Sequence, residues 1–384
     1  MMKLDQYLKE EDVDGFLMVS ESMNCANMYY MTKFLAPDPF TYLKKPEEEM
    51  IVVPQMEYER AKKESKVGVR SSLDYGMIEK LREVKDANRA FCEFLFEILQ
   101  KEEIKRVLVP LNFSIYTGDE LRKRGIEIEP VGGLVENERL IKEEGEMRYI
   151  RKAQKACEEA MQVALSTIEK AKIRDDTLIY DGEILTVEKV KSRMIYRLIE
   201  LGCASEDLIV ACGNQASDPH CSGSGPLMAG EPIIIDIFPR LMKERYCADM
   251  SRTISVGEPS DYVFEMYEAV LTAQERAIEM IRSGISCADV HNAVCDVFED
   301  GGYGTIRRGD HTGFIHSTGH GVGLDIHEKP TISENDYELK AGNVITIEPG
   351  LYYPDVGGVR IEDLLLVREK GYENLSIFEK KMLI

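Results

Sequence analysis

Residues 232–249 read Pro232-Ile-Ile-Ile-Asp-Ile-Phe-Pro-Arg-Leu-Met-Lys-Glu-Arg-Tyr-Cys-Ala-Asp249. The apolar residues on both sides of Asp236 predict a strand that is buried on both faces. An ionised carboxylate in such a strand is costly unless it is paired or binds a metal. Residues 239–245, which begin with Pro239, can turn the chain back, so we expect Asp249 to lie beside Asp236 on a paired strand. For Asp236 alone, a pairing with an arginine explains the burial equally well.

A second pair of carboxylates is found near the C-terminus. Val344-Ile-Thr-Ile-Glu348 is an apolar strand that ends in a carboxylate, and residues 353–358 form a turn. The chain is expected to return as a strand through Arg360 and Glu362. Because side chains alternate along a strand, Arg360 and Glu362 share one face, and Asp363 points the other way in a structural role.

The histidines are confined to one part of the chain, since all six lie between His220 and His327. His316 and His320 have the spacing of a zinc-binding helix, but the glycines at 319, 321 and 323 favour an extended segment packed close to other backbone. Three histidines within twelve residues, beside acidic residues, are more typical of a functional site than of a protein core.

The charges of these residues suggest a pair of metal ions. Asp236, Asp249, Glu348 and Glu362 carry four negative charges, which two divalent cations would balance, and one histidine would complete the ligand set. Such an oxygen-rich set suits Mn²⁺, Co²⁺ or Fe²⁺ better than a thiolate-bound Zn²⁺. Two ions roughly 3.5 Å apart can share a hydroxide and make it a nucleophile at neutral pH. The sequence therefore predicts metal-assisted hydrolysis.

Composition and pattern divide the chain into two domains. Residues 1–135 alternate strands and helices, contain no histidine and predict an α/β domain; residues 136–384 predict an α+β domain with a mostly antiparallel sheet. Residues 174–186 look like an extra hairpin with a turn at Asp181-Gly182.

The composition also excludes several classes of partner. The net charge of −21 argues against nucleic acid and anionic membranes as partners. We find no apolar run of 18 residues and no apolar signal core at the start of the sequence. The nine cysteines are scattered and form no CxxC pair, which predicts reduced thiols and a cytoplasmic protein.

In this order and spacing, the motifs resemble the pita-bread metallopeptidases, which include methionine aminopeptidase, aminopeptidase P and prolidase. The resemblance extends from about residue 144 to the end. The first third resembles the creatinase-like domain that precedes the catalytic domain in aminopeptidase P and prolidase. The resemblance thus implies a creatinase-like α/β domain, a pita-bread catalytic domain, a small peptide substrate and a homodimer.

The resemblance also implies the metal ligands. Asp236 would bind one ion, Asp249 and Glu362 would bridge both ions, and His320 and Glu348 would bind the other. Glu348 would in addition act as the general base. The ions implied are Mn²⁺ or Co²⁺, with Fe²⁺ or Zn²⁺ as alternatives.

Four further residues match positions on the substrate side of the family's site. His220 matches a histidine that precedes the first metal aspartate. His316 and His327 would hold the substrate carbonyl and stabilise the tetrahedral intermediate. Arg360 would support the site and meet a substrate carboxylate.

Some residues do not follow the family pattern. His291 matches no family position and is expected on a helix surface or in the core, and His311 is expected in a loop. The family usually places an aromatic or apolar residue and then a glycine after the first metal aspartate, whereas here the sequence continues Ile-Phe-Pro239-Arg240. This departure bears on which substrate the resemblance implies, and it leaves the implied metal ligands unaffected.

The activity implied is hydrolysis of the Xaa-Pro bond at the N-terminus of dipeptides or short peptides. A prolyl nitrogen carries no N–H, so a peptidase that needs this donor misses the bond, whereas histidines that orient the carbonyl do not need it. Two alternatives stay open. One is a non-peptidase enzyme on the same fold, such as a metal-dependent lyase or hydrolase of small zwitterions. The other is a non-catalytic binding relative. The presence of ligand-type residues at all five metal positions argues against it.

Overall fold

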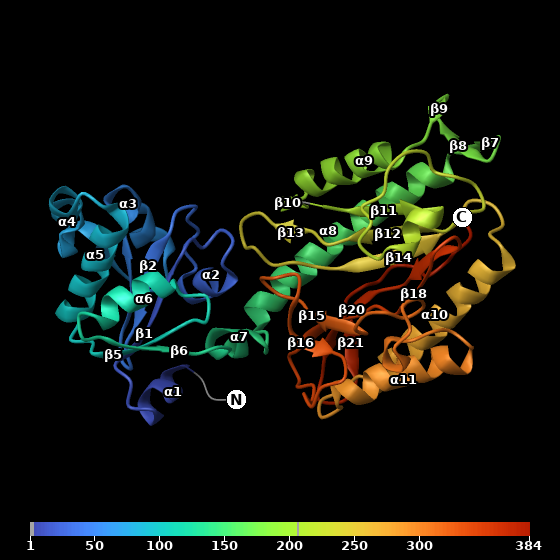
Figure 1. The fold of residues 1–384 in the computed structure, drawn as a ribbon. Coiled ribbons are helices and arrows are strands. Elements are labelled where there is room, and N and C mark those ends of the chain that lie inside the picture. The colour runs from blue at the N-terminus through green and yellow to red at the C-terminus, as the bar shows by residue number, and fades with distance from the viewer. Residues whose placement is uncertain (1–3, 206) are drawn as a thin grey trace. The chain divides into compact units, whose positions relative to one another are not determined.

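The computed structural model describes residues 4–205 and 207–384, and it divides into two compact units, Met1–Arg139 and Leu140–Ile384 (Figure 1). The seam predicted after residue 135 falls inside helix α7 (Leu134–Arg139), and Leu134 and Val135 of this helix belong to the apolar core of the first unit. Among the helices in these described residues, none combines the length and apolar character that a membrane crossing requires.

The first unit is a six-stranded mixed sheet with the strand order β4-β3-β2-β1-β5-β6. Alternate residues of its strands feed two apolar clusters: Phe16 and Met18 pack with α1, α2, α3 and α7, and Leu17 packs with α5 and α6 on the other face. The elements are β1 (Gly15–Ser20), β2 (Phe40–Lys44), β3 (Glu49–Val53), β4 (Gly68–Ser71), β5 (Arg106–Val109), β6 (Glu127–Pro130), α1 (Leu4–Glu10), α2 (Ala26–Thr32), α3 (Gln55–Glu64), α4 (Met77–Val84), α5 (Ala87–Lys101) and α6 (Ile115–Arg122). The predicted α/β class is confirmed.

The helical pattern of residues 77–101 is interrupted in the structure. Apolar spacing without glycine or proline predicts one helix there, and this prediction is wrong. Lys85 adopts a left-handed backbone conformation with φ of 55°, and the side chain of Asp86 caps the next helix by accepting the backbone N–H of Arg89 at 2.8 Å. An aspartate offers this cap more readily than it continues a helix, so α4 ends and α5 begins.

The second unit combines antiparallel sheets with two pairs of helices. α8 packs against β12 and β14, while α10 and α11 share one apolar core with β17, β18, β19 and β20. Its main elements are α8 (Glu144–Glu169), α9 (Val187–Glu200), α10 (Asp261–Met280), α11 (Cys287–Asp300), β11 (Ile209–Cys212), β12 (Ile233–Ile237), β14 (Met250–Ile254), β15 (Gly319–Gly321), β16 (Glu328–Ile332), β17 (Val344–Ile347), β18 (Gly350–Tyr353), β19 (Gly357–Arg360), β20 (Asp363–Val367) and β21 (Tyr372–Asn374). The predicted α+β class is confirmed.

The extra segment at residues 174–186 forms the predicted hairpin. β8 (Thr177–Tyr180) and β9 (Glu183–Ile184) are joined by Asp181 and Gly182, whose φ values of 50° and 82° suit a tight hairpin turn. A further strand that the sequence pattern did not reveal, β7 (Lys172–Arg174), pairs with β8 through a second turn of the same kind at Asp175 and Asp176.

Candidate metal centre

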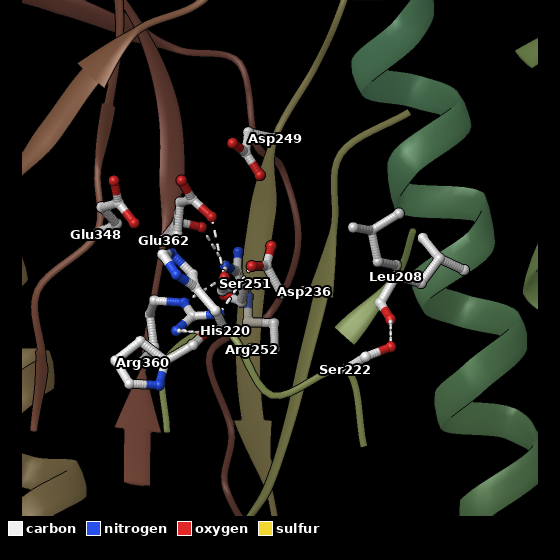
Figure 2. Close-up of polar contacts among 12 residues, drawn as sticks. Leu208, His220, Ser222, Asp236, Asp249, Ser251, Arg252, Glu348, Arg360 and Glu362 are labelled. Atoms are coloured by element: carbon white, nitrogen blue, oxygen red, sulfur yellow. Dashed lines mark hydrogen bonds and ion pairs between the residues drawn. The ribbon is translucent and has the colours of Figure 1, made fainter. Parts of the chain in front are cut away.

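Four carboxylates meet where strands of the second unit begin and end. Asp236 lies in β12 opposite Ser251 of β14, and Asp249 directly precedes β14, so alternation places Asp249 and Asp236 on one side of the sheet. Glu348 directly follows β17, and Glu362 directly precedes β20, its antiparallel partner. Figure 2 shows these carboxylates gathered around one region, with the guanidinium of Arg360 beside them.

His320 completes this group from β15. Its Nε2 lies 3.6 Å from Oδ2 of Asp249 and 3.2 Å from Oε1 of Glu348, and its Nδ1 lies 3.1 Å from the backbone oxygen of Gly321. The strand can approach this closely because residue 319 is glycine: a Cβ there would lie 2.0 Å from the backbone oxygen of Thr346.

The group is buried and strongly acidic. Asp249 is 4 % exposed and Glu362 is 1 % exposed. Burial raises the pKa of both carboxyl groups well above the ordinary value, and the neighbouring carboxylates raise it further. Burial also raises the pKa of Glu348 and lowers the pKa of His320. His320 therefore does not supply a positive charge that would balance the carboxylates.

Arg360 binds one oxygen of Asp236 directly and is connected to one oxygen of Glu362 through Ser251. Its Nη2 donates to Oδ2 of Asp236 at 2.8 Å, and its Nε donates to Oγ of Ser251 at 3.0 Å. Ser251 in turn donates to Oε2 of Glu362 at 3.0 Å. The other oxygens, Oδ1 of Asp236 and Oε1 of Glu362, are buried and have no hydrogen-bond partner among the described residues.

Unpartnered buried carboxylate oxygens fit a bound cation. Asp249, His320 and Glu362 each offer an atom that lies within 4.8 Å of the others, which is a compact ligand set. Oxygen ligands with one imidazole nitrogen suit divalent ions of the Mn²⁺ and Co²⁺ kind. The residues present thus fit the metal ions that the sequence predicts.

Tyr352 connects His316 to Arg360, and the sequence pattern did not single it out. Its hydroxyl accepts a hydrogen bond from Nη1 of Arg360 at 2.9 Å and lies 3.0 Å from Nε2 of His316. Residues 348, 350 and 352 alternate along the extended chain, which is a signal that could have placed Tyr352 on the side of Glu348. Ser251 follows Asp249 by two residues, so the same alternation could have placed Ser251 on the side of Asp249.

The three histidines that were predicted to lie on the substrate side, His220, His316 and His327, line one cavity of about 790 Å³ together with the carboxylates and Arg360. His220 and His327 are exposed and His316 is half-buried. The ring centroid of His327 lies 4.3 Å from that of His320, in an edge-on arrangement. A cavity of this size holds a small organic molecule or a short peptide.

Comparison with known proteins gives the family. Residues 148–369 match metallopeptidase family M24, and residues 1–141 match the creatinase/prolidase N-terminal domain. The chain belongs to metallopeptidase family M24. It is 31% identical over 383 residues to the Xaa-Pro dipeptidase of Pyrococcus furiosus, a match that covers 99% of this chain and 98% of the relative.

Solved structures of M24 relatives share the fold over nearly the whole chain. The prolidase from Pyrococcus horikoshii OT3 has a TM-score of 0.81 at 29% identity, and the Xaa-Pro dipeptidase from Bacillus anthracis has a TM-score of 0.82 at 27% identity. Each match covers 99% of this chain and 98% of the other. The predicted resemblance to the pita-bread metallopeptidases and the fold class are therefore confirmed.

The two histidines outside the family pattern differ in their surroundings. His311 is exposed in a loop. His291 is buried in α11, with Nδ1 2.9 Å from Oγ1 of Thr318 and Nε2 3.7 Å from Sγ of Cys295. The backbone oxygen of Thr318 accepts the N–H of Glu348 at 2.8 Å. His291 is thus a core residue that supports the segment next to Glu348.

Replacing His291 by phenylalanine is expected to lower the free energy of unfolding of this M24 chain by about 1–3 kcal/mol, because it leaves the buried hydroxyl of Thr318 without its partner. Urea unfolding followed by circular dichroism measures the effect. His311→Phe is the control, and its exposed position predicts no change. Equal unfolding midpoints for His291→Phe and the wild type would contradict this account.

The raised carboxyl pKa values predict how pH acts on the metal-free protein. Asp249, Glu348 and Glu362 bind protons more tightly in the folded chain than in the unfolded chain, where their pKa is about 4. The folded state therefore loses stability as the pH rises from about 4 through the raised pKa values. This loss arises because the charged carboxylates repel one another, and bound divalent cations offset that repulsion.

The gain in Tm on adding Mn²⁺ to chelator-treated protein is consequently expected to grow as the pH rises from 5 to 8. Thermal unfolding at each pH, with and without Mn²⁺, tests this trend. A metal-dependent gain that shrinks over this range would show that the carboxylates do not bind the ion in their charged form.

Proposed function

We propose that this M24 metallopeptidase hydrolyses the Xaa-Pro bond at the N-terminus of dipeptides or short peptides with two divalent ions, Mn²⁺ or Co²⁺. Five residues would hold the ions: Asp236, Asp249, His320, Glu348 and Glu362. The observation that carries this assignment is the pair of buried carboxylate oxygens, on Asp236 and Glu362, that lack a hydrogen-bond partner in the described residues. The Xaa-Pro dipeptidase relatives, which match over 99% of this chain, support the substrate class.

Hydrolysis at this ligand set would also require activation of water and transfer of a proton. Divalent ions in such a site supply Lewis acidity and activate water for attack. Glu348 lines the cavity, and its raised pKa suits a group that accepts a proton from the attacking water and later gives it to the leaving nitrogen.

The substrate carbonyl would be held by histidines. His316 is fixed through Tyr352, and His327 lies against His320 at the exposed side of the cavity. The imidazole of His327 can donate a hydrogen bond to a carbonyl oxygen that gains negative charge during attack. His316 already donates from Nδ1 to the backbone oxygen of Ser317 at 2.7 Å, so it would donate to the substrate from Nε2 only in its protonated form. Neither contact needs an N–H on the scissile bond. An Xaa-Pro substrate requires this, because its prolyl nitrogen carries no N–H.

A comparison of three peptides tests the proposal. Ala-Pro, Ala-Pro-Ala and Met-Ala-Ser are incubated with chelator-treated protein to which Mn²⁺, Co²⁺ or no metal is added, and the products are separated by chromatography. We expect cleavage of at least one Xaa-Pro peptide with metal, no cleavage without it, and none of Met-Ala-Ser. Failure to cleave either Xaa-Pro peptide with any metal would overturn the assignment.

A further inference from the structure

A second cavity, of about 350 Å³, adjoins the cavity of the metal centre. Three residues line both cavities: Phe238, Ile326 and His327. His327 also packs against the proposed ligand His320, so it lies at the boundary between the two spaces. The other residues that line the second cavity are Ala204, Arg240, Cys247 and Asp325.

Two paired strands lead from the metal centre into the second cavity. Along the first, Asp236 lines the catalytic cavity, Phe238 lines both, and Arg240 lines the second cavity. Along its partner, Asp249 lines the catalytic cavity and Cys247 lines the second, and Cys247 forms a β-bridge with Arg240. One continuous face therefore carries two of the proposed ligands, Asp236 and Asp249, at one end and Arg240 at the other.

The distance along this face suits a short peptide. Arg240 lies four positions after Asp236, which is at most about 13 Å of extended chain. A two-residue substrate spans about 7 Å, which fits within this length. Arg240 is anchored because β13 (Arg240–Leu241) pairs with β10 (Cys203–Ala204), and its side chain is half-buried.

The charged groups of the cavity favour one kind of ligand. A guanidinium binds a carboxylate through two parallel hydrogen bonds. Asp325 lines the same cavity, and its carboxylate opposes an anionic ligand. The two charges thus predict opposite effects of substitution at Arg240 and Asp325.

We propose that the second cavity is a substrate subsite in which Arg240 binds a carboxylate of the peptide. The proposal rests on the proposed function, because it takes the neighbouring cavity as the place of cleavage. Two substrate groups have this chemistry: the C-terminal carboxylate of a dipeptide and the side chain of an acidic N-terminal residue. The subsite gives a role to the Pro239-Arg240 sequence, which departs from the family pattern and takes no part in the metal centre.

Two pairs of substrates separate these groups. Ala-Pro and Ala-Pro-amide differ only in the C-terminal carboxylate, and Glu-Pro and Gln-Pro differ only in the charge of the first side chain. Arg240→Gln is expected to raise KM at least roughly tenfold for the charged member of one pair, with little change in kcat and little effect on the neutral member. Asp325→Asn is expected to lower KM for that same peptide.

The pair that responds identifies which carboxylate is bound. If Arg240→Gln changes KM equally for both members of each pair, or for none, the subsite proposal is wrong. Thermal unfolding of both variants, compared with the wild type, shows whether each remains folded, and Arg240→Lys, which keeps the charge, is expected to retain part of the discrimination.

A binding measurement keeps this test independent of catalysis. Calorimetric titration of the same four intact peptides into the Mn²⁺-loaded Glu348→Gln protein, with and without Arg240→Gln, reports affinity without turnover. If the wild type cleaves no Xaa-Pro peptide but the charge-selective binding depends on Arg240, the proposed function fails while the carboxylate subsite stands. If cleavage occurs and neither KM nor affinity depends on Arg240, the subsite alone is overturned.

Discussion

Replacing Asp249 by alanine is expected to abolish peptide hydrolysis and metal binding together while the chain remains folded. Asp249 is buried, and its carboxylate lies near His320 and Glu362 in the compact ligand set. Changing residues that only hydrogen-bond to metal ligands already costs about 10–100-fold in affinity or activity, so loss of a residue that is proposed to bridge both ions should lower kcat/KM by at least about 10³-fold. Folding should persist because the substitution removes a repelled buried charge.

Calorimetric titration with Mn²⁺, an Ala-Pro assay and circular dichroism check the three parts of this expectation. Asp300→Ala is the matched control, because Asp300 is an exposed aspartate at the end of α11. The control should behave as the wild type in all three measurements. Normal turnover by Asp249→Ala would remove Asp249 from the catalytic site.

Replacing Glu348 by glutamine is expected to lower kcat by about 10²–10⁴-fold, the range that general acid–base catalysis contributes. Glutamine keeps the size of the side chain and one acceptor oxygen, but it replaces the other oxygen by an NH₂ donor and cannot accept the proton. Because Glu348 is also a proposed metal ligand, the wild type and the variant are both assayed at saturating Mn²⁺. The affinity for intact peptide should change much less than kcat. Steady-state kinetics of Ala-Pro hydrolysis and calorimetric titration measure the two quantities, and Glu334→Gln, at an exposed position, is the control.

An unchanged kcat for Glu348→Gln would assign the proton transfer to another group. An equal loss of peptide affinity and kcat would instead make Glu348 a substrate-binding residue. Only a selective loss in kcat agrees with the general-base role.

The position of the site could be predicted from the sequence because its residues are unusual for their surroundings. Asp236 and Glu348 adjoin strands of isoleucine and valine, where a charge needs a partner, and the structure brings both residues into one cavity. The glycines around His320 likewise predicted the close approach of β15 to neighbouring backbone. These signals are local, so the sequence carries them directly.

The residues that support the site could not be predicted in the same way. Ser251 meets Arg360 from 109 residues away, and His291 meets Thr318 from a different element. Such contacts depend on how sheets and helices pack, and a serine or a buried histidine has no local pattern that reveals its partner. The break between α4 and α5 was missed for a related reason, since one cap at Asp86 outweighed a continuous helical pattern.

The second cavity shows a further limit of local patterns. The sequence marks Pro239-Arg240 as a departure from the family, but only the pairing of Arg240 with Cys247 and the shared residues Phe238 and His327 connect it to the catalytic cavity. If Arg240 binds a substrate carboxylate as proposed, this departure marks a position that sets specificity, and the fold is needed to say for which substrate group.

Stepwise addition of Mn²⁺ to chelator-treated protein, with Ala-Pro hydrolysis measured after each step, tests the central claim most directly. The account predicts no hydrolysis without metal, and activity that rises until two ions are bound per chain. Hydrolysis that persists in the chelator, or that is complete with one ion per chain, would contradict a two-metal peptidase site formed by Asp236, Asp249, His320, Glu348 and Glu362.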